Sequence, residues 1–256
     1  MNKVFAFLGA LALIAAHRAF ALEPLEETVE QQYDVAANVS VSVVNTDGSI
    51  RVYGAEASKI SIQAIKKAYT QERLEGIVVD IKASSDDVTI TTTIPPRKNP
   101  LSDRSGTVDY IIVVPQTAKV RQLELTNGEL LVEGLRGGSA SARLVNGWLA
   151  GHNCFGDLAL KVETGRLDVA YDWWENHEFS VKAFNTRGNI RASFPSDSAI
   201  NLTASAPAGR IANGFDTGKT SPADIVHSVS EVLGSDAGAV IGLEAQRGNI
   251  RIEKTY

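Results

Sequence analysis

The sequence has few of the side chains that build covalent crosslinks and metal sites. Cys154 is the only cysteine, so no disulfide can form within one chain. A zinc site needs three or four ligands at compatible spacing. His152 stands two residues from Cys154, and His177 is far from both in the sequence. We therefore expect no metal and no cofactor, and we expect Cys154 to be a small buried apolar residue.

Long apolar runs are also missing, apart from one near the start. Val4 to Ala16 is apolar, but it is shorter than the roughly 18 residues that a membrane span requires. Lys3 precedes this stretch and Ala19-Phe20-Ala21 follows it, which is the pattern of a secretory signal peptide with its cleavage site. The sequence predicts a signal peptide over 1–21 and a mature chain that begins at Leu22. That chain would have no transmembrane span and would be periplasmic, cell-surface or secreted.

An excess of positive charge is absent as well. The formal net charge is −5, and loss of Lys3 and Arg18 with the signal peptide lowers it to −7. A mildly acidic protein is a poor binder of nucleic acid, so we expect no nucleic-acid partner. The sequence also contains no Gly-x-Ser-x-Gly motif, phosphate loop or dinucleotide fingerprint.

The sequence does contain a short phrase that recurs seven times. In each copy a turn residue and a glycine are followed by any residue and then by Ile or Leu. The copies are Asp47-Gly48-Ser49-Ile50, Asn127-Gly128-Glu129-Leu130, Asn146-Gly147-Trp148-Leu149, Thr164-Gly165-Arg166-Leu167, Arg187-Gly188-Asn189-Ile190, Ala208-Gly209-Arg210-Ile211 and Arg247-Gly248-Asn249-Ile250. From Gly128 the glycines are 19, 18, 23 and 21 residues apart, and then 39, which is close to two steps. A period near 20 is typical of a solenoid.

The repeat has an inner and an outer side. Five residues before each glycine the side chain is always apolar: Val43, Leu123, Ala142, Leu160, Ala183, Ala204 and Leu243. This position is seven residues from the Ile or Leu, and such positions point to opposite faces of a straight strand. Because both are apolar, we expect the chain to bend at the glycine. A meander of hairpins remains an alternative, since Asn-Gly also marks hairpin turns. We favour an all-β β-solenoid, a single-stranded β-helix-like stack of ~20-residue coils.

The periodicity also suggests how the chain is organised. We expect an acidic, flexible leader over 22–35 and then one continuous domain over 36–256. Within that domain we expect irregular N-terminal strands over 36–115, regular repeats over 116–215, and a loop with a capping coil over 216–256.

Four segments resemble those of a known family. They are Asn45-Thr46-Asp47-Gly48-Ser49-Ile50, Val113-Val114-Pro115, Leu123-Glu124-Leu125-Thr126-Asn127-Gly128 and Gln246-Arg247-Gly248-Asn249-Ile250-Arg251-Ile252. In their order they resemble a bacterial exported β-strand-repeat family of unknown function, provisionally named as an auto-transporter adhesin head domain. The resemblance covers the chain from about residue 36. It implies a β-helix-like fold and an envelope location, and the family name suggests adhesion. It supplies no functional residues. Glu163-Thr164-Gly165 and Pro207-Ala208-Gly209 depart from the Asn-Gly pattern, so we expect looser corners there.

Catalytic residues are not apparent at the outward positions beside the glycines. Glycoside hydrolysis needs two carboxyl groups about 5–9.5 Å apart, and no acid lies above another acid at these positions. Glu163 and Asp168 share one coil, where each is more simply solvated or paired with Arg166 or Arg191. We therefore expect no catalytic residue and no enzymatic activity.

Two features suggest ligand contacts. Trp173 and Trp174 lie beside acids in the longest regular step, where they could stack on sugar rings; alternatively, one fills the core and the other lies on the surface. Arg166 and Arg191, with Arg187 and Arg210, could form a basic stripe that holds an anionic polymer, or simply a solvated face. The candidate ligand contacts are thus Trp173, Trp174, Arg166 and Arg191.

These expectations favour an exported, non-enzymatic β-solenoid that acts as an adhesin-like binding protein or an envelope-associated surface protein. Its partner is unknown, and a polysaccharide or an envelope protein would fit. Two alternatives stay open: a polysaccharide-active enzyme on a β-helix, and a self-associating structural protein of the envelope.

Overall fold

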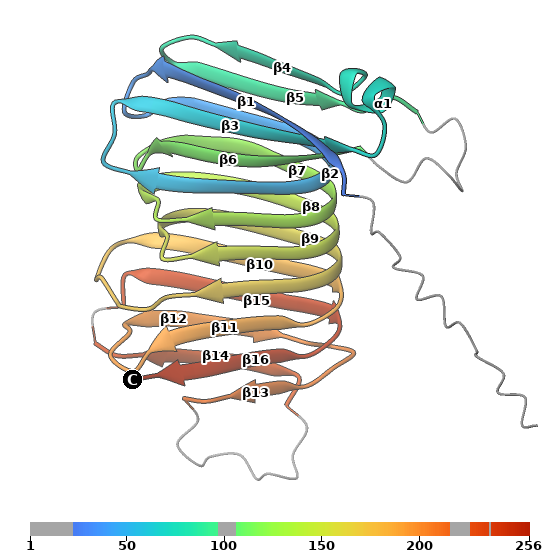
Figure 1. Cartoon of the computed structure of the whole chain (residues 1–256). Coiled ribbons are helices and arrows are strands. Elements are labelled where there is room, and N and C mark those ends of the chain that lie inside the picture. Colours follow the sequence, from blue (N-terminus) through green and yellow to red (C-terminus); the bar gives the residue numbers. More distant parts are fainter. Residues whose placement is uncertain (1–22, 97–105, 216–225, 236) are drawn as a thin grey trace, which may run out of the picture.

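The computed structural model describes residues 23–96, 106–215, 226–235 and 237–256 (Figure 1). The expected signal peptide lies outside the described residues. The described chain is all-β, with 16 strands in one open, mixed sheet and one short helix, so the all-β prediction is confirmed. No helix in the described ranges is long and apolar enough to cross a membrane.

The elements follow one another along the chain with short connections. They are β1 (Leu25–Asp34), β2 (Ser40–Ala55), β3 (Lys59–Ala68), α1 (Gln71–Glu75), β4 (Val78–Ala83), β5 (Asp87–Thr93), β6 (Thr107–Pro115), β7 (Lys119–Glu133), β8 (Arg136–His152), β9 (Phe155–Ala170), β10 (Phe179–Arg187), β11 (Ile190–Pro195), β12 (Ile200–Ser205), β13 (Ile211–Asn213), β14 (Ser228–Leu233), β15 (Ala239–Arg247) and β16 (Ile250–Thr255).

The middle of the sheet is parallel and in register. β2 pairs with β7, β7 with β8 and β8 with β9, and these pairings place Gly48, Gly128, Gly147 and Gly165 opposite one another. Figure 1 shows the strands lying one above another. Hairpin partners would be antiparallel, so the meander alternative is wrong for these four strands.

The glycines are required where neighbouring repeats meet. Gly147 has a φ of 135°, and a Cβ built on it would lie 1.9 Å from the carbonyl oxygen of Gly128. Gly165 has a φ of 138°, and its Cβ would lie 1.9 Å from the oxygen of Gly147. The Thr164-Gly165 corner is therefore as tight as its Asn-Gly neighbour, and the expectation of a looser corner was wrong there. Only glycine combines this φ with so close a backbone.

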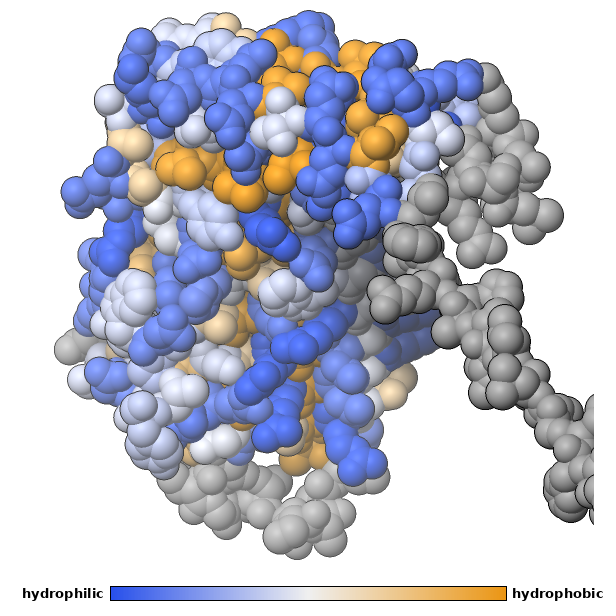
Figure 2. All heavy atoms as spheres, in the orientation of Figure 1, coloured by the Kyte–Doolittle hydropathy of each residue, from blue (hydrophilic) through white to orange (hydrophobic). Residues whose placement is uncertain are grey.

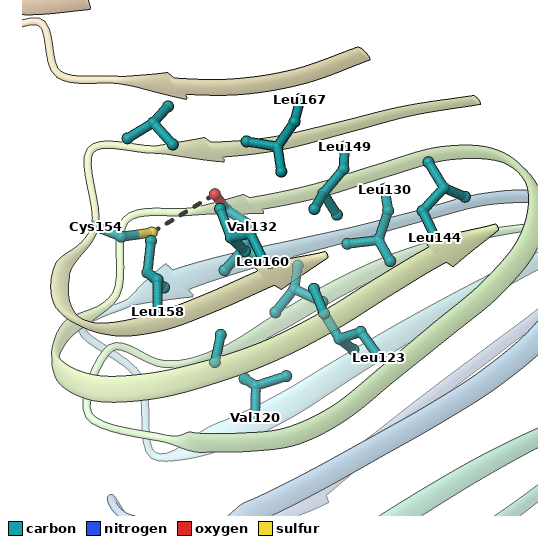
Figure 3. Packing of buried hydrophobic residues seen from close by; sticks show 14 of the residues in the cluster. Val120, Leu123, Leu130, Val132, Leu144, Leu149, Cys154, Leu158, Leu160 and Leu167 are labelled. Atoms are coloured by element: carbon teal, nitrogen blue, oxygen red, sulfur yellow. Dashed lines mark hydrogen bonds between the residues drawn. The ribbon is translucent and has the colours of Figure 1, made fainter. Parts of the chain in front are cut away.

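The Ile or Leu two residues after each glycine lies in the core, as the repeat predicted. Leu130, Leu149 and Leu167 are 0% exposed and Ile190 is 1% exposed. Figure 3 shows Leu123, Leu144 and Leu160 from one side of the bend pointing into the same interior. The bend thus lets both halves of each repeat bury their apolar side chains together.

Replacement of one of these leucines tests the core. Leu167→Ala should lower the free energy of unfolding by about 2–5 kcal/mol, because the surrounding strands cannot collapse onto the lost volume. Chemical denaturation measures this change. Leu131→Ala is the matched control, since Leu131 is only half-buried. Equal losses in the two variants would contradict the assignment of an inner and an outer face.

The C-terminal strands occupy an unexpected position. β15 pairs in parallel with both β10 and β12, and β16 lies between β11 and β13. The last repeat is therefore inserted into the stack one place before its end, and the capping coil expected over 216–256 was wrong in this respect. Strands β12, β13 and β14 lie beyond it instead, and β14 pairs antiparallel with β12.

The N-terminal leader was also mispredicted. Residues of the segment 22–35 form β1, which pairs antiparallel with β3 along ten residues. The acidic side chains have partners there, because Lys66 Nζ lies 2.8 Å from Glu27 and Lys67 Nζ lies 3.3 Å from Glu26. The acidic composition suggested disorder only because these lysines are distant in the sequence.

Candidate functional site

The order of the strands gathers arginines on one outer face. Arg191 of β11 lies directly opposite Asp168 of β9 on one side and opposite Arg251 of β16 on the other. Figure 2 shows hydrophilic side chains over the lower part of the molecule, where β11 and β16 lie in Figure 1. The insertion of the C-terminal repeat thus brings Arg251 beside Arg191, although 60 residues separate them.

These side chains line an open groove, which we call the arginine groove. Its volume is about 460 Å³, and its lining residues are Arg166, Asn189, Ile190, Arg191, Asn249, Arg251 and Glu253. The lining is polar apart from Ile190, whose side chain belongs to the core. Such a volume lies within the range of about 300–1,000 Å³ that small-ligand sites occupy.

Two carboxylates hold the arginines in place. Glu253 accepts from Arg191 Nε at 2.8 Å and lies 2.7 Å from Arg251 Nε. Asp168, which is nearly buried, accepts from Arg166 Nε at 2.7 Å and from Trp148 Nε1 at 2.7 Å. Each guanidinium therefore has one fixed edge and keeps further N–H groups for a ligand, because arginine carries five donors.

The two asparagines form a ladder across the floor of the groove. Asn189 Oδ1 accepts from the backbone N–H of Asn249 at 2.9 Å, and Asn249 Oδ1 accepts from the backbone N–H of Arg210 at 3.0 Å. Both side-chain oxygens are thereby engaged. Neither Nδ2 group has a hydrogen-bond partner in the described part of the chain, so both amides remain available as donors.

The electrostatics of this face favour an anion. The arginines Arg166, Arg191, Arg210 and Arg251 outnumber the acids Asp168 and Glu253, although the whole protein is acidic. The hydrogen bond from Arg191 holds the pKa of Glu253 below its ordinary value. Glu253 thus stays ionised at neutral pH and competes with a ligand for two of the arginines.

The tryptophan pair lies at the other end of the strands, after β9. Trp174 is half-buried and packs on Tyr171, with ring centroids 5.4 Å apart. Trp173 is 44% exposed, and its Nε1 donates to Glu175 at 2.8 Å. One ring therefore packs against the core while its neighbour lies on the surface. The structure does not bring these rings together with Arg166 and Arg191.

The histidine and the acids beside this pair are bonded to one another. His152 lies between two carboxylates, 2.9 Å from Asp172 and 3.3 Å from Glu133. Asn153 donates to Asp172 at 3.0 Å, and this hydrogen bond lowers the pKa of that carboxyl. Across the described residues, no group of three or more His, Cys, Asp or Glu side chains is arranged to hold a metal ion.

Cys154 lies in the core, as expected. It is 0% exposed, and burial raises the pKa of its thiol to about 11. The thiolate is the reactive form of cysteine, so this side chain is chemically inert at neutral pH.

Sequence reasoning found Arg166 and Arg191 but missed Arg251, Asn249 and Glu253. The signal for them was the last step of 39 residues, which leaves room for one further repeat between Gly209 and Gly248. The C-terminal repeat instead stacks between the repeats of Gly188 and Gly209, and this place follows from strand pairing rather than from spacing.

Comparison with known proteins gives limited information. No protein-family model matches the chain, and no curated protein matches it. The family resemblance noted from the motifs thus has no matching family model behind it.

Several solved structures are similar to this chain at low sequence identity. A provisionally named cell adhesion protein from Clostridium sporogenes is 13% identical, with 91% of this chain and 100% of that chain covered, at a TM-score of 0.49. A provisionally named adhesin from Bacteroides fragilis is 12% identical, with coverages of 90% and 97%, at a TM-score of 0.33. Another from Parabacteroides distasonis is 8% identical, with the same coverages, at a TM-score of 0.23. At these values none of them assigns a function.

Proposed function

We propose that this protein is an exported, non-enzymatic β-solenoid that binds acidic polymers of the cell envelope or its surroundings through the arginine groove. The observation that carries the proposal is the open groove itself, which is lined by three arginines and by the amide side chains of Asn189 and Asn249. In-register parallel pairing of successive repeats supports the solenoid part of the proposal.

The chemistry of the groove fits carboxylate or sulfate groups. Arginine binds such groups through paired N–H donors, and these charge-assisted bonds are among the stronger ones in proteins. Arg191 and Arg251 stand opposite each other on strands about 4.8 Å apart. Arg166 bonds to Asp168, which stands opposite Arg191 on its other side, so the positive charges run across three neighbouring strands. A row of cations matches a chain that carries repeated negative charges better than it matches one isolated anion.

The groove residues are suited to binding rather than to bond cleavage. Glu253 accepts from two arginines and Asp168 from Arg166 and Trp148, so each acid is committed to orienting the lining. A general acid or base instead needs its proton-transfer site free to reach the substrate. We therefore propose adhesin-like binding without turnover.

The proposal is tested by measuring binding to polygalacturonate and heparin, with dextran as the neutral polymer. Arg166→Ala and Arg251→Ala should each raise the Kd for the acidic polymers about five-fold, since an exposed charge contact contributes about 1 kcal/mol. The matched control is Arg121→Ala, because Arg121 is also an exposed arginine, 2.7 Å from Asp87, and lies outside the groove.

A variant that is expected to strengthen binding provides a second test. Glu253→Gln should lower the Kd at neutral pH, because it removes the carboxylate that competes for Arg191 and Arg251. Equal affinities for the acidic polymers and for dextran would refute the proposed ligand class. Release of new reducing or unsaturated ends from any of the polymers would refute the absence of turnover.

A further inference from the structure

A second opening lies on the face formed by β10, β15 and β12. Gly242 is in the middle of β15, opposite Lys182 of β10 and Thr203 of β12. Side chains stand on both sides of it, so the missing side chain leaves a notch. The notch has a volume of about 350 Å³.

Gly242 differs from the glycines at the corners of the repeats. It is not among the glycines with a positive φ. A Cβ built on it would have Thr203 Oγ1 and Val181 O as its nearest neighbours, both at 3.7 Å, which is ordinary contact. Neither backbone conformation nor crowding therefore requires glycine here.

Glycine in the middle of a strand has a cost. It weakens the strand through its conformational freedom, and it brings no side chain to pack. Such a glycine often marks a place where a ligand or another chain approaches the backbone closely. The neighbouring strands leave open space above Gly242. We therefore explain this glycine by the approach of a ligand and not by the approach of another chain.

The lining of this notch combines one aromatic ring with polar groups. Phe184 is half-buried, and Lys161 Nζ lies 5.6 Å from its ring centroid. Thr203 and Ser205 contribute exposed hydroxyl groups, and Glu244 contributes a carboxylate. Among the described residues neither Glu244 nor Lys182 has an ion-pair partner, so both charged groups are available.

The apolar part of this face continues beyond the notch. Val240 stands two residues before Gly242 on the same side of β15 and is 49% exposed. A ligand in the notch therefore meets apolar surface at Phe184 with hydrogen-bonding groups beside it, and Val240 extends the apolar surface just outside the notch. Pyranose rings have this division, with C–H groups on their faces and hydroxyl groups around their edges.

We propose that the notch over Gly242 binds one ring of a neutral sugar chain. The ring packs against Phe184, and its hydroxyl groups bond to Glu244, Thr203 and Lys182. A carboxylate accepts from two adjacent hydroxyl groups, while the ammonium group of lysine donates to ring or hydroxyl oxygens. This site is separate from the arginine groove and needs no acidic group on the ligand.

The experiment fills the notch without disturbing the fold. Gly242→Val places a β-branched side chain in a strand, which favours the extended conformation. Its Tm should equal or exceed that of the unmodified chain. Binding is measured by calorimetry with cellotetraose, maltotetraose, mannotetraose and xylotetraose, and the variant should lose binding to whichever of these the unmodified chain binds.

The matched control is Ala159→Val. Ala159 is an exposed residue of β9 opposite Lys182, so it occupies the same outward row outside the notch. This control should bind normally. Phe184→Ala should weaken binding about three- to ten-fold, since an aromatic contact contributes about 0.5–1.5 kcal/mol. Phe184→Ala also keeps the test decisive if Gly242→Val does not fold.

Three results would overturn the inference: no binding of any of the four sugars to the unmodified chain, unchanged binding by Gly242→Val, or equal loss in Ala159→Val. Arg251→Ala should leave sugar binding unchanged. A sugar site that is lost in Arg251→Ala but not in Gly242→Val would belong to the arginine groove instead.

Discussion

Gly147→Ala should leave little or no folded protein. The added Cβ would lie 1.9 Å from the Gly128 carbonyl oxygen, and the φ of 135° is strained for any residue with a side chain. The neighbouring repeats cannot separate, because β8 is paired on both sides over most of its length. We expect a loss of more than about 4 kcal/mol, which few single substitutions reach.

Denaturation curves and hydrogen exchange measure this effect. Gly242→Ala is the matched control, since the same methyl group meets nothing closer than 3.7 Å there. That variant should be as stable as the unmodified chain or slightly more stable. Similar destabilisation in both variants would show that the corners do not depend on close glycine contacts.

Removal of residues 239–256 should have the second largest effect. This truncation takes away β15 and β16, and with them the buried side chains of Ile241, Leu243, Ile250 and Ile252. Strands β12 and β13 then lose their parallel partners, and β10 and β11 lose one neighbour each. We expect exchange protection to disappear over 200–213 and to weaken over 179–195.

The rest of the stack should survive the truncation. In a repeat architecture each unit depends mainly on its direct neighbours, so protection should persist over β7, β8 and β9. Addition of a peptide that spans residues 239–256 should restore protection over 200–213. Full protection there in the truncated chain alone would show that the inserted repeat does not support β12 and β13.

Local spacing was enough to predict the repeats, but it was not enough to predict how distant segments pair. The sequence predicted the bend at Gly147 and the burial of Leu149, because the bend and the apolar spacing both lie within one repeat. The place of β16 is set by its pairing with β11 and β13, which lie far from it in the sequence. β1 was missed for the same reason, because its partners in β3 lie 25 to 43 residues away, from the Asp34–Lys59 pair to the Leu25–Ala68 pair.

The candidate site was predictable to the same extent. Arg166 and Arg191 stand at regular positions after their glycines, so their shared face followed from the repeat. Arg251 and Glu253 complete the groove only because the last repeat is inserted beside β11. The sequence alone does not distinguish Gly242, because the notch depends on Lys182 and Thr203 on the neighbouring strands.

The position of the inserted repeat affects the order in which the strands can pair during synthesis. Synthesis runs from the N-terminus, so β12 and β13 emerge before the strands that they must pair with exist. The order of assembly therefore differs from the order of synthesis, and the parallel pairing of β12 and β13 waits for residues 239–255. Until β15 and β16 are made, β12 and β13 expose unpaired strand edges, which proteases and chaperones recognise. The topology thus makes the stacking of β12 and β13 depend on strands that are synthesised after them.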